Sequence, residues 1–429
     1  MKRYLIILTV ILIGLTAPFH TGALTVEPKY PGSLHTLIAA PEKVTALSVI
    51  CPIDASDIYY ISSAMTMLHQ LDLSNATVSE YSGKPLSPAH TGIHQPNAIP
   101  PYAFMECQAT ELSLPSTTRR IGYAAFAGSQ LTSLDLPDGL TEVDAYAFQS
   151  SALKSVTLPP SLTVIGEGAF QKCTSLESVT ASGSLTAIGS KAFEGTALTT
   201  LDLSECSALR QIGPWAFSGM KQLATVILPS GITEIGHGAF MNDWSLTQIV
   251  MSDQLGKLPA LMLYGTESLT SVKIPAAVDS IGSFAMGDMA SLTSLDASSP
   301  RSVPGLETNV WGGTPVTNVR LYVPERLVNY YSTAEQWRDF IIEGVSGIDL
   351  INADTTSDIT ITRNGDMLHV ESDSHLKSVR LIDCSGKVLA ELRPDAQSCD
   401  INIDTLPHSV CIVQCTTTGG VVSATKVSI

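Results

Sequence analysis

The stretch Leu131-Thr-Ser-Leu134-Asp-Leu136-Pro137, followed by Val143 and then by Ala147-Phe148, contains the repeating unit of this chain. The pair that ends the unit recurs, and later degrades in register, at Ala103-Phe104, Ala125-Phe126, Ala147-Phe148, Ala169-Phe170, Ala192-Phe193, Ala216-Phe217, Ala239-Phe240, Met262-Leu263, Ala285-Met286 and Val310-Trp311. The steps between the large residues are 22, 22, 22, 23, 24, 23, 23, 23 and 25 residues. An aliphatic residue precedes each of them by five positions, from Ile99 to Leu306.

A fixed period of roughly 20–29 residues with L-x-x-L-x-L strands is typical of a leucine-rich solenoid. One turn cannot bury its apolar face alone, so it buries that face against the next turn. We expect Leu131, Leu134 and Leu136 to point inward from a short strand that Pro137 ends, because proline cannot donate to a strand ladder. The small Ala should let a short helical turn approach the strands. The large residues should fill the interior as a column, namely Phe104, Phe126, Phe148, Phe170, Phe193, Phe217 and Phe240.

The array is expected to occupy residues 84–324 in about ten turns, which would span about 45–50 Å at an inter-strand spacing of roughly 4.8 Å. Residues 24–83 are interpreted as an N-terminal segment and cap, because end repeats must present a polar outer face. Within them, Leu68 to Leu73 carries the strand signature without a preceding Ala-Phe turn. Tyr81 to Ile99 is rich in Pro, Ser, Gly and His and is predicted to be a long loop.

The sequence after the array changes period twice. Residues 325–343 are predicted to form an amphipathic capping helix, because apolar and aromatic residues recur there at helical spacing, at Leu327, Tyr330, Tyr331, Ala334, Trp337 and Phe340. Residues 344–357 read as a linker rich in Gly, Ser, Asn, Asp and Thr. Residues 358–429 alternate as six or seven short strands, which predicts a small all-β sandwich.

Composition limits the classes of partner. The 429 residues carry a net charge of −16, and only 15% of them are charged. A diffuse acidic surface disfavours nucleic acid and anionic membranes as partners.

Residues 1–23 are predicted to be a secretory signal peptide. Lys2 and Arg3 form the charged start, Tyr4 to Leu15 form the apolar segment, and Thr21-Gly-Ala23 offers small residues for cleavage. The apolar run is too short for the alternative, a membrane anchor, and no later segment is long enough to cross a bilayer. We therefore expect an exported product with no transmembrane span after signal removal.

The eight cysteines include no C-x-x-C motif. Cys107 and Cys173 both stand three residues after a column Phe and three turns apart, which separates them by roughly 14 Å, too far for a disulfide. They are interpreted as small buried apolar residues. Export would permit disulfides in the C-terminal cluster of Cys384, Cys399, Cys411 and Cys415, whose three possible pairings the sequence does not distinguish.

The repeat resembles the BspA-type leucine-rich repeats of bacterial surface proteins. The residues that carry the resemblance are Leu162-Thr-Val-Ile-Gly-Glu-Gly-Ala-Phe170 and Ile232-Thr-Glu-Ile-Gly-His-Gly-Ala-Phe240, and the segment from Tyr322 to Phe340 is similar to the end of such arrays. The resemblance covers about residues 42–343. It implies a solenoid at the cell surface, in a family that includes adhesins binding host matrix proteins or other bacteria.

The tail resembles the C-terminal sorting domain of proteins exported by the type IX system of Bacteroidota. Val379 to Leu389, with Gly386 at its turn, is similar to the first strand pair of that domain. The motif residues are Leu406, Val410, Val413 and Lys426, while Ser409 and Cys411 depart from the usual Gly and aromatic residue. The resemblance implies that the export machinery recognises the tail and that the product is fixed to the outer surface, and it leaves open whether the tail is removed on export.

A catalytic site is not predicted. His90-x-x-x-His94 could hold a metal, but it lies in a Pro/Gly-rich segment with no third ligand at suitable spacing. His237 stands between two glycines, as a surface turn residue would. The chain contains neither a G-x-x-x-x-G-K-[ST] nor a G-x-S-x-G motif. No cofactor or metal is therefore expected.

The outward side of the predicted strands is the candidate binding face. It has one residue per turn, between the last two inward residues, at Asp135, Thr157, Thr180, Asp202, Ile227, Val250 and Lys273, with Ser113, Asp296 and Arg320 at its ends. Ser and Thr also suit a strand surface that serves only solubility. Ile227 and Val250 are adjacent apolar exceptions and form a possible contact patch. The lack of stacked aromatics weighs against glycan binding by ring stacking.

These observations predict an exported, adhesin-like cell-surface protein that is not an enzyme and binds host or bacterial surface proteins through the solenoid face. One alternative is a structural or scaffolding component of the cell envelope. Another is a hydrolase with an atypical site in the Tyr81–Ile99 segment or the tail.

Overall fold

The computed structural model describes residues 23–84, 92–181, 183–345, 359–364, 367–383, 388–404, 410–418 and 422–428. The chain divides into two compact units, one of residues 1–321 and 333–341 and the other of residues 322–332 and 342–429. The predicted signal peptide, apart from Ala23, and most of the predicted linker lie outside the described residues. Among the helices that are described, none has the length and apolar character needed to cross a membrane.

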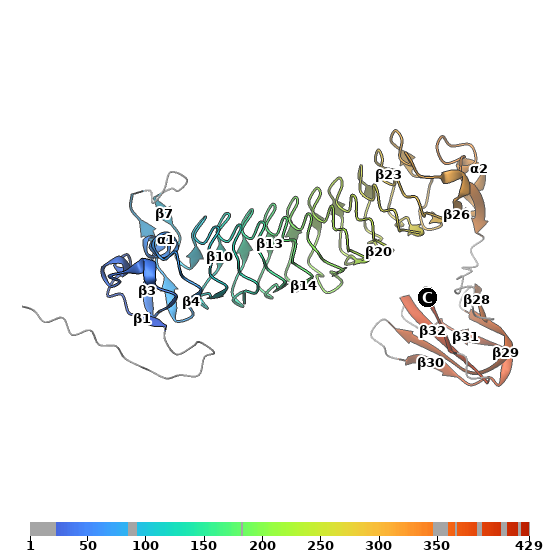
Figure 1. The fold of residues 1–429 in the computed structure, drawn as a ribbon. Helices are drawn as coiled ribbons and strands as arrows, with labels where there is room; N and C mark the ends of the chain where they lie inside the picture. The colour runs from blue at the N-terminus through green and yellow to red at the C-terminus, as the bar shows by residue number, and fades with distance from the viewer. Residues whose placement is uncertain are drawn as a thin grey trace, which may run out of the picture. The chain divides into compact units, whose positions relative to one another are not determined.

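The first unit is a stack of coils, most of which contribute two short strands (Figure 1). The first row contains the three-residue strands β9 (Glu111–Ser113), β12 (Ser155–Thr157), β14 (Ser178–Thr180), β16 (Thr200–Asp202), β18 (Thr225–Ile227), β20 (Gln248–Val250), β22 (Ser271–Lys273) and β24 (Ser294–Asp296). These strands are parallel, and the described pairs are β12–β14, β16–β18–β20 and β22–β24.

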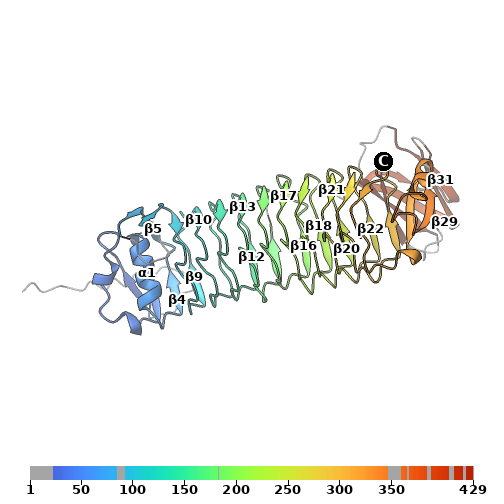
Figure 2. The same ribbon diagram turned by 90° about the horizontal axis from the view of Figure 1, so that it is seen from above.

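The second row contains the two-residue strands β8 (Ala98–Ile99), β10 (Arg120–Ile121), β11 (Glu142–Val143), β13 (Val164–Ile165), β15 (Ala187–Ile188), β17 (Gln211–Ile212), β19 (Glu234–Ile235), β21 (Lys257–Leu258), β23 (Ser280–Ile281) and β25 (Gly305–Leu306). The strands from β8 to β19 form one parallel sheet and those from β21 to β25 another. Figure 2 shows the two rows next to each other.

A column of stacked phenylalanine rings fills the interior. The seven rings from Phe104 to Phe240 are 0–2% exposed. Their neighbouring centroids are 5.1–5.5 Å apart, and adjacent ring planes differ by at most 18°. Because each coil adds one ring, the column joins the coils through their shared core.

The short helical turns expected at the Ala-Phe pairs are absent from the described coils, and ordinary turns stand in their place. The residue two positions before the large residue is left-handed, as in Tyr146 (φ 58°) and Trp215 (φ 52°). The N–H of Phe148 then donates to Ala169 O of the next coil at 2.7 Å. A backbone N–H used between coils is not available for a helix, so the fold is a β-solenoid with little helix.

The N-terminal segment adds further coils. β1 (Leu24–Val26), β2 (Ala46–Val49), β4 (Gln70–Asp72) and β9 form one parallel sheet, and β3 (Cys51–Ile53) pairs with β5 (Ala76–Val78). The array therefore has about 14 turns rather than ten. η1 (Leu34–Thr36), η2 (Pro41–Lys43) and α1 (Ala55–Ala64) connect these strands. Within the predicted loop, β6 (Tyr81–Ser82) pairs with β7 (Ile93–His94), and residues 85–91 lie outside the described residues.

Asp54 and Asp57 anchor this N-terminal part. Asp54 caps α1 by accepting the N–H of Ser56 at 2.8 Å. The Asp57 carboxylate accepts the N–H groups of Gly32 at 2.6 Å and Leu34 at 2.9 Å. Burial raises the pKa of Asp57 against the opposing effect of these hydrogen bonds.

The helix predicted over 325–343 is wrong. The segments present are η3 (Val316–Asn318), β26 (Arg320–Pro324), η4 (Glu325–Leu327), a four-residue α2 (Val328–Tyr331) and β27 (Ile341–Val345). Gln336 is left-handed, with φ 64°, and its amide bonds to the Val310 N–H at 2.9 Å and the Glu307 carbonyl at 2.8 Å. The buried Trp337 ring contacts Trp311, and its indole donates to Pro304 O at 3.1 Å. These side-chain contacts with the last coil stabilise a non-helical backbone more than the helical spacing of apolar residues would stabilise a helix.

The second unit contains an antiparallel sheet of β28 (Ile359–Asn364), β29 (Met367–Asp383), β30 (Val388–Leu392), β31 (Ala396–Asn402), β32 (Val410–Thr417) and β33 (Val422–Ser428). The first half of β29 pairs with β28 and β31, and its second half pairs with β30 and β32. Val370, Val379, Leu381, Ile401 and Val413 are buried in one core. The predicted fold class, a repeat solenoid followed by a small all-β region, is confirmed.

The described cysteines are free thiols. Cys173 is buried, and its Sγ lies 2.9 Å from Phe148 O, whereas Cys107 is only partly buried. Cys415 belongs to the core of the second unit, and Cys399 packs against that core. Cys384 and the side chain of Cys411 lie outside the described part of the chain.

Candidate functional site

The first row of strands brings most of the predicted binding residues into one column, which we call the strand face. Backbone pairing places Thr157 beside Thr180, Asp202 beside Ile227 and Ile227 beside Val250. The face also contains Lys273, which pairs with Asp296. Asp135 is exposed, but its coil has no assigned strand. The N–H of Arg320 donates to Thr293 O, which places Arg320 beside Ser294, one position away from the predicted column.

Ile227 and Val250 are the apolar centre of the strand face. Both are half-buried, and the neighbouring Thr180, Asp202 and Lys273 are exposed. Asp202 has a local structural role, because its Oδ1 accepts the N–H of Ser204 at 2.9 Å and so shapes the turn after β16. The carboxylate can still contact a partner through its other oxygen.

A second surface feature lies on the other row of strands and was missed by sequence reasoning. A groove of about 720 Å³ crosses β13, β15, β17 and β19. Its floor contains Gly166, Gly189, Gly213 and Gly236, each directly after a buried isoleucine. We call it the glycine groove. A Cβ on Gly236 would lie 2.2 Å from Pro214 N of the preceding coil, so the close approach of the coils requires glycine there. The recurring Ile-Gly pair is the sequence pattern from which the groove could have been predicted.

The rims of the glycine groove carry its polar groups. Glu234 stands on one rim, where its carboxylate accepts the amide of Gln211 at 2.8 Å. Glu167 stands on the other rim and accepts the hydroxyl of Tyr146. The same hydrogen bond is the main cause that raises the pKa of Tyr146 to about 12. Val164, at one end of the groove, is 40% exposed.

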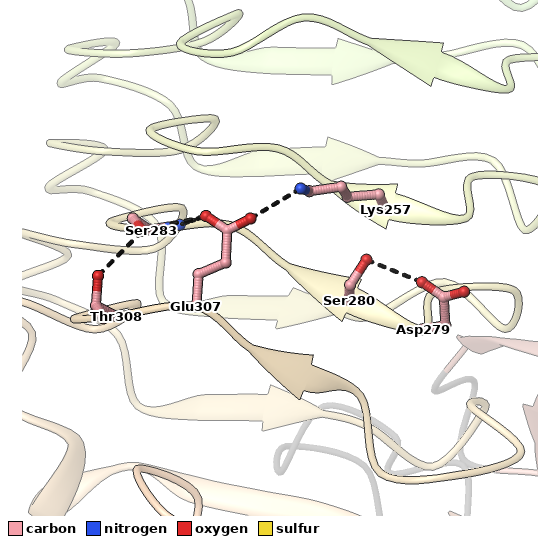
Figure 3. A network of polar contacts seen from close by, with 6 residues as sticks. All are labelled: Lys257, Asp279, Ser280, Ser283, Glu307 and Thr308. Atoms are coloured by element: carbon pink, nitrogen blue, oxygen red, sulfur yellow. Dashed lines mark hydrogen bonds and ion pairs between the residues drawn. The ribbon is translucent and has the colours of Figure 1, made fainter.

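Lys257 lines the other end of the groove and belongs to a network of polar contacts (Figure 3). Lys257 Nζ lies 2.9 Å from Glu307 Oε1. Glu307 Oε2 accepts the Ser283 N–H at 3.0 Å and the Ser283 hydroxyl at 3.1 Å. The Lys257 hydrogen bond is the main cause that lowers the pKa of Glu307, and the Ser283 donors add to it. The network spans two coil steps, so it ties three coils together.

The histidines considered for chemistry are held by ring contacts. The ring of His94 lies 6.0 Å from Tyr59 and 5.9 Å from Tyr81, measured between centroids. His237 is exposed and lies 4.1 Å from Trp215. His90 lies outside the described residues. Within the described ranges, no three His, Cys, Asp or Glu side chains come together in a way that could hold a metal ion.

Comparison with known proteins supplies the family. Residues 97–211 and 205–313 match the model described as "BspA type Leucine rich repeat region", in six copies. The chain belongs to this family. The two matches together cover residues 97–313, just over half of the chain, and span the coils from β8 to β25. Both the strand face from Thr157 to Lys273 and the glycine groove therefore lie within the BspA-type repeats.

Solved structures add similar proteins. A leucine-rich repeat protein from Bacteroides ovatus is 20% identical, with 72% of this chain and 85% of that chain covered and a TM-score of 0.34. A leucine rich cell surface protein from Faecalibacterium prausnitzii is 21% identical, with 75% and 86% covered and a TM-score of 0.28. The pneumococcal vaccine antigen PcpA is 18% identical, with 70% and 86% covered and a TM-score of 0.29. No curated protein matches the chain.

Proposed function

We propose that this BspA-type repeat protein is an exported, non-catalytic, adhesin-like protein that binds protein or other macromolecular partners on host or bacterial surfaces through the strand face. The observation that carries the proposal is the register of Asp202, Ile227 and Val250 on adjacent parallel strands. It places an apolar centre between exposed polar residues. An apolar centre with a polar rim is the usual anatomy of a protein interface.

Solenoids commonly bind through such extended surfaces, because neighbouring repeats present equivalent positions side by side. The outward residues of the strand face are mostly Thr, Asp and Lys, which favours a hydrogen-bonding protein surface as the partner. The acidic chain, with its net charge of −16, weighs against nucleic acid.

The proposed location rests on the two ends of the chain. The signal-like residues 1–23 support export, and the sorting-like tail supports recognition by the type IX machinery and attachment to the outer surface. Of the tail motif, Val413 is buried opposite Leu381, and the backbone of Lys426 pairs with Ile412. Gly386 and Leu406 lie outside the described residues.

Binding is tested with the purified chain on immobilised host extracellular-matrix proteins. We expect saturable binding that Thr180→Asp, Ile227→Asp and Val250→Asp each weaken while the melting temperature is retained. Met105→Asp is the matched control, because Met105 is 47% exposed and lies outside the strand face. Saturable binding that the three substitutions leave unchanged would exclude the strand face.

Location is tested separately by fractionating cells that express the chain with and without residues 358–429. The full chain should reach the outer surface, and the truncated chain should remain inside the envelope. Equal surface delivery of both forms would mean that the tail is not a sorting signal.

A further inference from the structure

The glycine groove is a surface distinct from the strand face. Four adjacent parallel strands form it, with Ile165 paired to Ile188, Ile188 to Ile212 and Ile212 to Ile235. Three coil steps separate the first strand from the last, roughly 14 Å at the usual strand spacing. The groove runs along the stacking direction, since its floor has one glycine from each coil.

The width of the groove selects an extended chain. Only three residue steps separate one rim from the other, as from Val164 to Glu167, at most roughly 10 Å of backbone. A helix with its side chains is about 10–12 Å across and would not fit between the rims. The floor N–H groups are already used, because Gly189 donates to Ile165 O and Gly213 donates to Ile188 O, both at 2.8 Å. Recognition must therefore come from side chains rather than from strand addition.

The charges of the groove are unbalanced. Lys257 at its end is neutralised by Glu307. Glu167 and Glu234 have only the Tyr146 hydroxyl and the Gln211 amide as side-chain partners, and the ion pairs found in the described part of the chain include neither carboxylate. Among the described residues, the groove thus offers two carboxylates that take part in no ion pair.

The positions of the two carboxylates define how far apart two cationic groups of a ligand must lie. They stand on opposite rims and three coils apart, roughly 14 Å along the groove, which is about four residues of an extended chain that lies along it. The surface between them is formed by Ala187, Pro214 and the glycine floor and is partly accessible. Small apolar residues between two cations would complement this surface.

We infer that the glycine groove binds an extended peptide segment of a partner protein that carries two Arg or Lys residues about four positions apart with small apolar residues between them. The inference rests on the proposed binding function and names a partner chemistry for a second surface. Bidentate hydrogen bonds to Glu167 and Glu234 favour Arg over Lys.

The experiment measures fluorescence anisotropy of labelled peptides with the full chain. The probe has two arginines four positions apart, with Val, Ala and Gly between them; a second peptide has glutamine in place of arginine, and a third has adjacent arginines. We expect saturable binding of the first peptide only, weakened by salt because the contacts are ionic. A linear neutral glucan is tested as a competitor, and its binding in place of the peptide would overturn the inference.

Three test variants and one control variant locate the site. Glu167→Gln combined with Glu234→Gln should weaken binding at least about tenfold, and Ala187→Trp should do the same by filling the groove. Glu177→Gln combined with Glu205→Gln changes the net charge equally at two exposed residues outside the groove and should have no effect. Glu167→Lys combined with Glu234→Lys should transfer the preference to a peptide with glutamates in place of the arginines. A folded charge-reversal variant that still prefers the arginine peptide would overturn the inference.

The outcomes separate this inference from the proposed function. Peptide binding that survives the loss of both carboxylates would refute the inference about the glycine groove and leave the strand-face proposal intact. If peptide binding depends on the groove but Ile227→Asp has no effect on partner binding, the strand-face proposal is refuted and the inference about the groove stands.

Discussion

The indole of Trp215 lies across Gly238 of the following coil, where a Cβ would stand 2.6 Å from both Cδ1 and Nε1 of the ring. Gly238 also has a left-handed backbone, with φ 62°. Tyr146 has the same relation to Gly168. In these two coils a Cβ at the left-handed position would occupy the space that the aromatic ring of the preceding coil fills, so glycine is required there.

Gly238→Ala should destabilise the solenoid more than Gly219→Ala. Both residues are left-handed, a conformation that costs a non-glycine residue about 1–2 kcal/mol. Gly219 has no atom within 4 Å of a Cβ, whereas at Gly238 the indole adds overpacking worth about 1–3 kcal/mol. Urea denaturation of both variants measures the difference. In a Trp215→Ala background the two substitutions should cost the same, and a persisting difference would mean that the ring is not the cause.

Phe170→Ala should cost about 3–5 kcal/mol, the range for removing a buried aromatic ring. Phe170 is fully buried between Phe148 and Phe193, at 5.1 Å from each. Thr180→Ala, at an exposed position, is the control and should change stability by less than about 0.5 kcal/mol. Chemical denaturation followed by circular dichroism gives both values. A cost for Phe170→Ala below about 1 kcal/mol would contradict the stacked column.

Asp243→Asn should flatten the pH dependence of stability. Asp243 is fully buried, and its Oδ1 accepts the Met220 N–H at 2.8 Å. Burial raises its pKa well above the ordinary value of 3.8. The folded state therefore keeps a proton that the unfolded state releases above about pH 3.8, so this residue lowers stability as pH rises from there toward the folded-state pKa. Melting temperatures of both proteins between pH 4 and pH 8 measure the effect, and parallel curves would refute it.

Glu307→Gln should weaken the C-terminal coils modestly. The Lys257–Glu307 pair is about half exposed, at 52% and 48%, so it contributes at most about 1 kcal/mol. The pKa of Glu307 is lowered from 4.5, so this contribution is present above about pH 4.5 and is lost as pH falls through the folded-state pKa. Hydrogen exchange around Ser283 in low and high salt should show the loss. Protection equal to the unsubstituted protein in low salt would argue against the network.

Much of the fold was predictable because every coil of the array carries the same sequence pattern. The 22–25-residue step, the aliphatic residue five positions earlier and the Ala-Phe pair each depend on one coil contacting the next, so they recur along the chain. The strand-face residues followed from the same alternation. The helix over 325–343 failed because Gln336 and Trp337 bond to the preceding coil, a contact that sequence spacing does not encode.

The sequence by itself determined the period, the residues that face the interior and the change to an all-β tail, because these follow from local apolar spacing. Only the tertiary structure decided that residues 24–78 continue the coils and that the turns are not helical, since both depend on which backbone carbonyl receives each N–H. It alone placed Glu167 and Glu234, 67 positions apart in the numbering, on opposite rims of one groove floored by glycines. Three coil steps separate these two residues in the stack, and the linear sequence does not state how far apart residues of different coils lie.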